Sequence, residues 1–329
     1  MELLQLTNKG LYCALGDFYI DPWEKVETAL ITHAHGDHAH WGMDRYIAVS
    51  KSEHILRKRM GEALIETHHY GESFRLGKVD VSLHPAGHIL GSSQVRIQYK
   101  DEVWVFTGDF KRDYDPTCEP FEVLPCDVFI SEATFALPVY RWPDFQHEMQ
   151  EILAWWMKNR EEGFNSVLCC YALGKAQRII AGLRELTDET IWVHGTVDEL
   201  NHCYEKTGLR WANVKKVPLE SKERFEGAMI LCPPSALGSG WHKRLSPKKV
   251  AFASGWMRLR GNRRRKGYER GFVISDHADW PSLLRTVKET GCKKVYFTHG
   301  NTDAIVRFLK DEGIDAYDLK MPYDTEGES

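Results

Sequence analysis

The sequence lacks any apolar run that approaches the roughly 20 residues needed to cross a lipid bilayer, which argues against a membrane protein. Its first ten residues, MELLQLTNKG, include an early acidic residue and no long apolar segment, so they do not resemble a secretory signal. The chain also lacks internal repeats, low-complexity tracts and heptad patterns, which argues against repeat and coiled-coil architectures. These absences predict a globular protein of the cytoplasm that has no membrane partner.

Cysteine pairs at metal-binding spacing are absent as well. The chain has eight cysteines, but they are scattered and never form a CxxC motif. In a reducing compartment such residues are mostly buried thiols, so a zinc ribbon or a disulfide framework is not expected. The composition is otherwise that of a globular protein with an ample core, at 43% hydrophobic and 27% charged residues. A length of 329 residues predicts one large domain or two coupled ones.

The net charge gives no support for a nucleic-acid partner, because it is −4 at pH 7. Positive charge is nevertheless concentrated in residues 257–271, MRLRGNRRRKGYERG, where seven arginine and lysine residues accompany a single acid. Two interpretations stay open for this basic run. It is either a local footprint for a polyanion or a solvated loop that balances nearby acids.

Hydrophobic patterning predicts an α/β chain with an insertion. Alternating runs at 78–88 and 93–109 predict strands, the second run forming a hairpin about Lys100 and Asp101. Residues 144–163 have helical spacing, and residues 166–186 read as a buried strand followed by a helix. The last 60 residues return to strand–helix units. We therefore expect one αβ domain that is interrupted by an αβ insertion over residues 138–269.

Four histidines and one aspartate occur within residues 31–40, ITHAHGDHAH. A solvated His-rich loop is one interpretation, and a metal site is the other. Five candidate ligands lie just past the ends of predicted strands, where sites gather in such sheets: His33, His35, His88, Asp109 and His299. A single histidine at a strand end is usually structural, but the agreement of five such residues favours the metal site.

The spacing within the HxHxDH motif suggests two metal ions. His33 and His35 can point the same way in an extended loop, while Asp37 and His38 can face a second ion. A carboxylate such as Asp109 can bridge both ions. Imidazole-rich ligation without thiolates favours Zn²⁺, with Mn²⁺ as the competitor. Such a pair of divalent ions lowers the pKa of a bridging water toward ~7 and holds the phosphoryl oxygens during attack.

These motifs resemble the metallo-β-lactamase superfamily, β-CASP branch, over nearly the whole chain. FYID, with Asp21 as a buried orienting acid, THAHGDH, PAGHILGS and FTGD resemble the four superfamily motifs. SEAT with Glu132, SDHAD with His277 and THG with His299 resemble motifs A, B and C of the branch. YALGKAQR and ASGWMRLRG resemble motifs of its cap domain. The fuller pattern is most similar to bacterial ligase-associated DNA exonucleases, which are Artemis-related nucleases.

The resemblance implies a four-layer αββα sandwich, formed by residues 1–137 and 270–329, with a β-CASP cap over 138–269 and the active site between them. It also implies that His277, oriented by Glu132, supplies a proton to the leaving 3′-oxygen. Together with Asp37 and Asp109, these two residues form the expected catalytic set. The alternative for the His277–Glu132 pair is a buried hydrogen bond that only braces the domain junction.

Substrate contacts are expected in the cap. The ammonium of Lys175 and the start of the following helix can hold a terminal or backbone phosphate. Ser254 and Gly255 can contribute a hydroxyl and an amide, and the basic run contributes Arg258 and Arg263. The alternative for Lys175 is an exposed lysine at a helix start.

The resemblance implies a metal-dependent DNA exonuclease that acts from a 5′ end in DNA repair, together with a DNA ligase and a helicase. One residue favours RNA instead. Artemis-type nucleases carry an apolar residue at motif C, whereas this chain has His299, as the RNA-processing enzymes of mRNA 3′-end processing and the ribonuclease J type do. A non-catalytic nucleic-acid-binding subunit is disfavoured by the intact metal motifs, and a small-molecule hydrolase is disfavoured by the basic run.

Overall fold

The computed structural model describes residues 2–218, 225–259 and 268–320, which divide into two compact units. The first unit comprises Met1–Arg141 and His277–Ser329, and the second comprises Trp142–Asp276. These boundaries differ from the expected insertion at 138–269. The physical reason lies in strand β17 (Arg270–Phe272), which pairs in parallel with β16 of the second unit, so the chain returns to the first unit only at His277.

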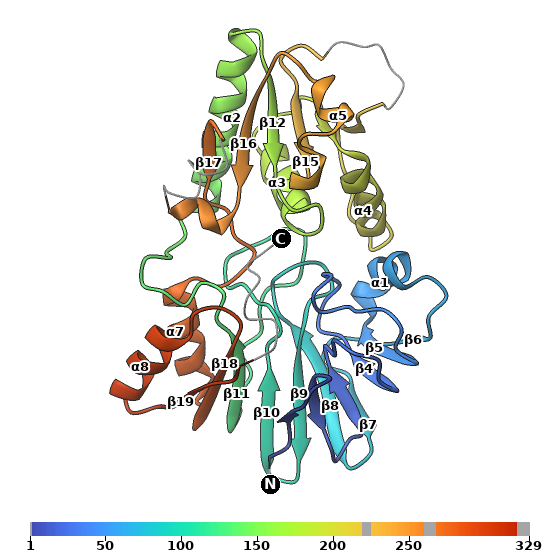
Figure 1. The fold of residues 1–329 in the computed structure, drawn as a ribbon, viewed down its shortest axis with the longest axis vertical. Coiled ribbons are helices and arrows are strands. Elements are labelled where there is room, and N and C mark those ends of the chain that lie inside the picture. The colour runs from blue at the N-terminus through green and yellow to red at the C-terminus, as the bar shows by residue number, and fades with distance from the viewer. Residues whose placement is uncertain (1, 219–224, 260–267, 321–329) are drawn as a thin grey trace. The chain divides into compact units, whose positions relative to one another are not determined.

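Two sheets form the first unit (Figure 1). The first sheet has the order β1-β2-β3-β4-β5-β6, and the second has the order β19-β18-β11-β10-β9-β8-β7. The strands of the first sheet are β1 (Gln5–Leu6), β2 (Leu11–Cys13), β3 (Phe18–Ile20), β4 (Thr28–Leu30), β5 (Arg45–Val49) and β6 (Ile65–His68). Those of the second sheet are β7 (Ser73–Leu76), β8 (Val79–Pro85), β9 (Ser93–Tyr99), β10 (Glu102–Phe106), β11 (Val128–Glu132), β18 (Lys294–Thr298) and β19 (Asp315–Asp318).

The core of the first unit lies between these sheets and behind the second one. Because side chains alternate along a strand, Trp104 and Phe106 of β10 join a cluster shared with the first sheet, whereas Val105 packs on the opposite face. That opposite face is covered by α7 (Trp280–Thr290) and α8 (Asp303–Asp311). A short η1 (Ser50–Ser52) and α1 (Glu53–Met60) complete the described helices of this unit.

The strand directions bring distant loops together. In the first sheet β3, β4, β5 and β6 are parallel, and in the second sheet β10, β11, β18 and β19 are parallel. The carboxyl ends of parallel strands meet at one edge of a sheet, where the following loops carry side chains free of the ladder. The candidate ligands Asp109 and His299 follow β10 and β18 of the second sheet, and His33 follows β4 of the first.

The second unit contains a fully parallel sheet with the order β14-β13-β15-β12-β16-β17. Its other strands are β12 (Asn165–Cys169), β13 (Ile191–Val193), β14 (Val214–Lys216), β15 (Met229–Cys232) and β16 (Lys248–Ala253). Its described helices are α2 (Phe145–Glu161), α3 (Lys175–Arg184), α4 (Gly195–Glu205), η2 (Pro234–Ala236), α5 (Gly240–Lys243) and η3 (Gly255–Arg258). Separate apolar clusters cover the two faces of the sheet, as expected for parallel strands.

The described helices include none that is long and apolar enough to cross a membrane.

Candidate metal centre

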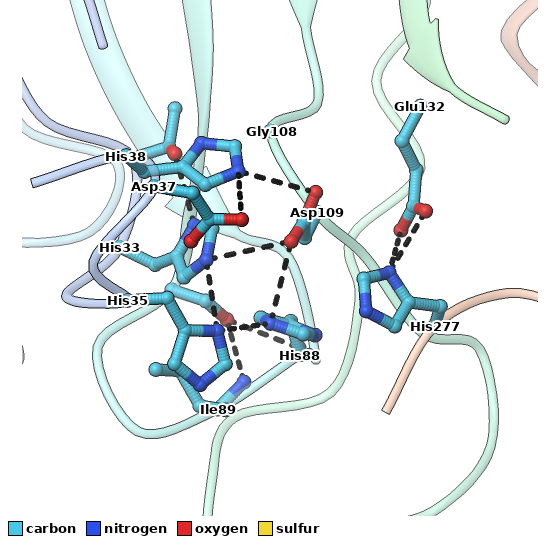
Figure 2. A network of polar contacts seen from close by, with 12 residues as sticks. His33, His35, Asp37, His38, His88, Ile89, Gly108, Asp109, Glu132 and His277 are labelled. Atoms are coloured by element: carbon cyan, nitrogen blue, oxygen red, sulfur yellow. Dashed lines mark hydrogen bonds and ion pairs between the residues drawn. The ribbon is translucent and has the colours of Figure 1, made fainter. Parts of the chain in front are cut away.

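Four side chains converge on one point in the first unit (Figure 2). The His35 Nδ1 atom lies 3.1 Å from His33 Nε2 and 3.0 Å from His88 Nε2. The Asp109 Oδ2 atom lies 3.5 Å from His33 Nε2 and 3.7 Å from His88 Nε2. All four ligand atoms lie within 4.8 Å of one another, and three of the side chains are buried.

Hydrogen bonding alone does not account for this arrangement. A ring nitrogen carries either one proton or one lone pair, so the Nδ1 atom of His35 cannot make good hydrogen bonds to two other imidazoles. Ligands at 2.0–2.1 Å from a tetrahedral zinc ion lie about 3.4 Å apart, which is close to the observed nitrogen and oxygen separations. Three imidazoles and a carboxylate therefore fit a divalent cation.

A second set of ligands lies on the other side of Asp109. The Nε2 atom of His38 is 3.5 Å from Asp109 Oδ1 and 3.9 Å from Asp37 Oδ2. The ring of His299 lies 5.6 Å from the His38 ring, measured between centroids. The two oxygens of Asp109 thus face different ligand sets, which is the geometry of a bridging carboxylate. The structure brings together all seven residues expected as metal ligands from the sequence.

His299 has an uncommon backbone conformation for a residue other than glycine. Its φ is +58°, and its Nδ1 atom lies 3.0 Å from the hydroxyl of Thr298. The next residue, Gly300, also has a positive φ, and a Cβ there would lie 2.4 Å from the carbonyl oxygen of Ala133. The close approach of two backbones therefore requires glycine after His299, and the strain occurs where the ring is brought toward His38.

Asp21 orients two of the imidazoles. Its carboxylate accepts from the Thr32 amide at 2.8 Å and from the Thr32 hydroxyl at 2.6 Å. Because that hydroxyl donates to Asp21, its oxygen accepts from His33 Nδ1 at 3.1 Å. His38 Nδ1 lies 2.8 Å from the same carboxylate. Both rings therefore keep a proton on Nδ1 and turn Nε2 toward a metal position, as outer residues of metal sites commonly arrange.

The charges around the second ligand set favour a cation. Burial lowers the pKa of His38, but the charges of Asp109, Asp37 and Asp21 outweigh it and raise this pKa to about 10. Partial loss of hydration raises the pKa of Asp37, yet the neighbouring histidines outweigh that effect and lower it to about 2. At His33, burial and the surrounding imidazoles together lower the pKa well below its usual value. His33 is therefore held neutral, while the carboxylates attract positive charge beside His38.

Glu132 and His277 form a buried pair next to the bridging carboxylate. His277 Nδ1 lies 2.8 Å and 3.0 Å from the two oxygens of Glu132, which also accepts from the Phe110 amide at 2.7 Å. The polar atoms of Asp109, Glu132 and His277 lie within 4.8 Å of one another. Because Nδ1 donates to Glu132, the Nε2 atom lies on the opposite side of the ring, as Figure 2 shows.

The sequence analysis missed the segment Lys111–Glu122, which braces the loop of His88. The amides of Lys111 and Glu122 donate to the carbonyls of Ala86 and Pro85 at 3.1 Å each. The Lys111 ammonium lies 3.4 Å from the His88 carbonyl oxygen. It also lies 2.7 Å from Asp115 Oδ2, and both charged side chains are almost fully buried. The only sequence signal was a lysine and an aspartate at spacing i, i+4, which is common on surfaces.

The expected substrate residues that the structure describes lie in the second unit. Lys175 is 1% exposed, and its ammonium lies 3.5 Å from Asp276 and 4.4 Å from the centre of the Tyr171 ring. It is therefore a buried, charge-paired lysine and not an exposed helix start. The Ser254 hydroxyl accepts from the Trp256 amide at 3.3 Å and so caps η3.

Gly255 is buried at the start of η3, and Arg258 is exposed at its end. Arg263 and most of the basic run lie outside the described residues.

Curated proteins of known name resemble the chain at low identity. No family model matches it. A protein of Opitutus terrae named Probable DNA ligase is 27% identical over 313 residues, which cover 94% of this chain and 30% of that protein. Endoribonuclease YSH1 of Yarrowia lipolytica is 30% identical over 43% of this chain and 16% of its own length. Cleavage and polyadenylation specificity factor 73 of Drosophila melanogaster is 25% identical over 55% of this chain and 29% of its own.

These relatives agree with the motifs and with the ligand cluster that the fold assembles. They support the resemblance of the chain to nucleases of the β-CASP branch of the metallo-β-lactamase superfamily. The chain spans less than a third of the length of these curated relatives.

A solved structure also resembles this chain. It is a protein of unknown function from Enterococcus faecalis V583, with a TM-score of 0.58 and 13% sequence identity. The alignment covers 91% of this chain and 80% of the other. At this identity the likeness shows a shared fold alone.

Proposed function

We propose that this protein is a metal-dependent nuclease that hydrolyses phosphodiester bonds of DNA from a 5′ end. The observation that carries the proposal is the bridging position of Asp109 between two ligand sets, one with His33, His35 and His88 and one with Asp37 and His38. A pair of divalent ions, with Zn²⁺ favoured over Mn²⁺, supplies an activated water and neutralises phosphoryl charge when bound. His299 completes the second set.

The proton for the leaving 3′-oxygen comes from His277 in this proposal. Burial raises the pKa of Glu132, but the charge of His277 and hydrogen bonds outweigh this effect and lower it. Glu132 therefore stays a carboxylate, holds the proton on His277 Nδ1 and leaves Nε2 to donate to the substrate. We extend the proposal to the fold, with the first unit as a four-layer αββα sandwich and the second as the substrate-binding cap.

DNA is the favoured substrate because the relative that covers 94% of the chain bears the name of a DNA ligase. A nuclease that trims DNA ends would prepare them for a ligase, so joint action with a ligase, and with a helicase that exposes strands, is part of the proposal. RNA is the second candidate, because relatives named endoribonucleases match part of the chain and because His299 occupies motif C.

The 5′ polarity rests on a contact between Lys175 and a terminal phosphate. The contact requires the phosphate to replace Asp276 beside the buried ammonium. Replacing Lys175 by alanine should reduce the preference for phosphorylated over hydroxyl ends by about 1–3 kcal/mol. The Lys175→Arg variant, which keeps the charge, should retain part of the preference. Equal loss for both kinds of end would remove Lys175 from the contact.

The decisive experiment incubates the purified protein with Zn²⁺ or Mn²⁺ and with end-labelled DNA and RNA strands of one sequence, each with and without a 5′-phosphate. We expect metal-dependent release of mononucleotides from DNA, with RNA spared. The Asp109→Ala variant should cleave nothing. The control is Asp44→Ala, because Asp44 is an exposed aspartate paired with Lys25 at the surface. Absence of cleavage by the wild type would refute the proposal, and faster digestion of RNA would favour the second candidate.

A further inference from the structure

The loop that carries the metal ligands continues into an exposed tryptophan. Trp41 is 71% exposed, the largest value among the large apolar side chains in the described part of the chain. It follows His38 by three residues, so their Cα atoms are at most about 11 Å apart. The proposed mechanism and the metal sites do not use this side chain. The indole therefore presents a flat aromatic surface near the proposed metal ligands.

Trp41 stands on an anchored backbone. The ring of the preceding residue, His40, donates from Nε2 to the carbonyl of Asp37 at 2.9 Å. The carbonyl of His40 accepts from the hydroxyl of Tyr46 at 2.8 Å, and that hydroxyl in turn accepts from the amide of Met43 at 3.2 Å. Tyr46 is 1% exposed. Because the chain is hydrogen-bonded both before and after Trp41, the backbone that carries the exposed indole is held in place.

An arginine lies against the same loop. Arg59, in α1, donates from Nε to the carbonyl of Ala39 at 3.4 Å. A Cβ at Gly36 would lie only 2.3 Å from the Arg59 guanidinium, so the glycine in the HxHxDH motif leaves room for this charge. Asp37, the metal ligand of this turn, has a side chain that is 72% exposed and would repel phosphates. The half-buried guanidinium of Arg59 offsets that repulsion.

We propose that Trp41 and Arg59 form a contact site for single-stranded nucleic acid, in which a base stacks on the indole and a backbone phosphate meets the guanidinium. Single-strand-binding surfaces combine these two chemistries, because every base has a face for stacking and every linkage has a charge. The inference rests on the proposed nuclease function and adds a strand contact within the first unit. A partner protein covering Trp41 is the competing outcome.

The test separates stacking from general effects on the loop. Binding of a phosphorothioate oligothymidine strand is compared with binding of an abasic strand of equal length, with Zn²⁺ present. The wild type should prefer the base-bearing strand, and Trp41→Ala should reduce affinity for it by about 5- to 150-fold while changing affinity for the abasic strand little. Trp41→Phe should retain most of the preference. Tyr317→Ala is the control, since Tyr317 is an exposed aromatic residue of β19.

Arg59 has its own readout. The logarithm of the affinity falls with the logarithm of salt concentration by about 0.7 per phosphate contact on single strands. The Arg59→Met variant should therefore flatten this slope by about 0.7, for base-bearing and abasic strands alike. An unchanged slope would remove Arg59 from the site.

Two outcomes at Trp41 would overturn the inference and leave the nuclease proposal intact. One is an equal loss of affinity for both strands in Trp41→Ala, which would assign Trp41 to loop structure. The other is unchanged binding by Trp41→Ala while the wild type still cleaves. A wild type that neither binds nor cleaves any strand would overturn the nuclease proposal, and with it this inference.

Discussion

Replacing Lys111 by methionine should destabilise the protein by about 3 kcal/mol, the lower part of the range for breaking a buried ion pair. The side chains of Lys111 and Asp115 are 0% and 3% exposed, and their charged atoms are 2.7 Å apart. Without the ammonium, Asp115 keeps hydrogen bonds from the amide and hydroxyl of Thr117 at 2.8 Å and 2.6 Å. These bonds are the reason to expect the lower part of the range.

A double variant distinguishes the lost charge partner from lost packing. In Lys111→Met with Asp115→Asn neither charge of this pair remains, so at least about 2 kcal/mol of the loss should be recovered. Urea unfolding of the metal-free protein at pH 7 measures both variants. The matched control is Lys25→Met, because Lys25 and Asp44 also lie 2.7 Å apart but are 68% and 56% exposed. That variant should lose at most about 1 kcal/mol.

Metal affinity then tests whether the contact between the Lys111 ammonium and the His88 carbonyl positions the His88 ring. Both variants lack the ammonium beside the His88 carbonyl, so both should bind Zn²⁺ about 10-fold more weakly in competition with a chelator. The double variant should show this loss although its stability is largely restored. If its metal affinity returned together with its stability, Lys111 would have no role in positioning the ligand. If the double variant were as unstable as the sum of the single variants, the charge argument would be wrong.

Three further predictions concern the same centre. Thr32→Val removes the hydroxyl that fixes the proton on His33, and should weaken Zn²⁺ binding about 10- to 100-fold in a chelator competition. In metal-free protein the pKa of His38 is raised to about 10, so protonated His38 contributes its full stabilisation below about pH 6.5 and loses it as the pH rises through 10. The melting temperature of EDTA-treated protein should therefore fall over this pH range. The His38→Asn variant should not show this pH-dependent fall. His277→Ala should lower the cleavage rate by about 10²- to 10⁴-fold without changing strand affinity, whereas an equal loss of affinity would assign the Glu132 pair a bracing role.

The convergence of the ligands could be predicted because it depends on strand direction. His33 follows β4, and Asp109 and His299 follow β10 and β18, each at a carboxyl end. Alternation of apolar residues in 93–109 correctly predicted the hairpin of β9 and β10, and Lys100 adopts the positive φ (+55°) that a tight turn needs. Strand alternation, turn residues and ligands at strand ends are all encoded by residues that are close together in the sequence. They can therefore be predicted from one sequence alone.

The contacts that support the ligands could not be predicted, because they join residues without periodic pattern. Lys111–Glu122 contains no helix or strand, yet it holds consecutive carbonyls of the His88 loop. The pairing of Lys175 could not be predicted, because its partner Asp276 lies about a hundred positions away in the sequence. The strand β17 lies in the second unit, beyond the expected end of the insertion, because its apolar run does not reveal which sheet it joins.

Asp37 connects the metal ligands to the proposed strand contact through its two kinds of polar group. Its carboxylate lies 3.9 Å from His38, while its main-chain carbonyl accepts from His40, the residue that anchors Trp41. A shift of this turn would therefore move a ligand and the indole together. Linkage between two binding sites is reciprocal. If a metal ion at this turn raises the affinity for a strand, a bound strand raises the affinity for that ion by the same factor. If both proposals hold, the short HxHxDH turn would couple metal and strand binding without requiring a change elsewhere in the first unit.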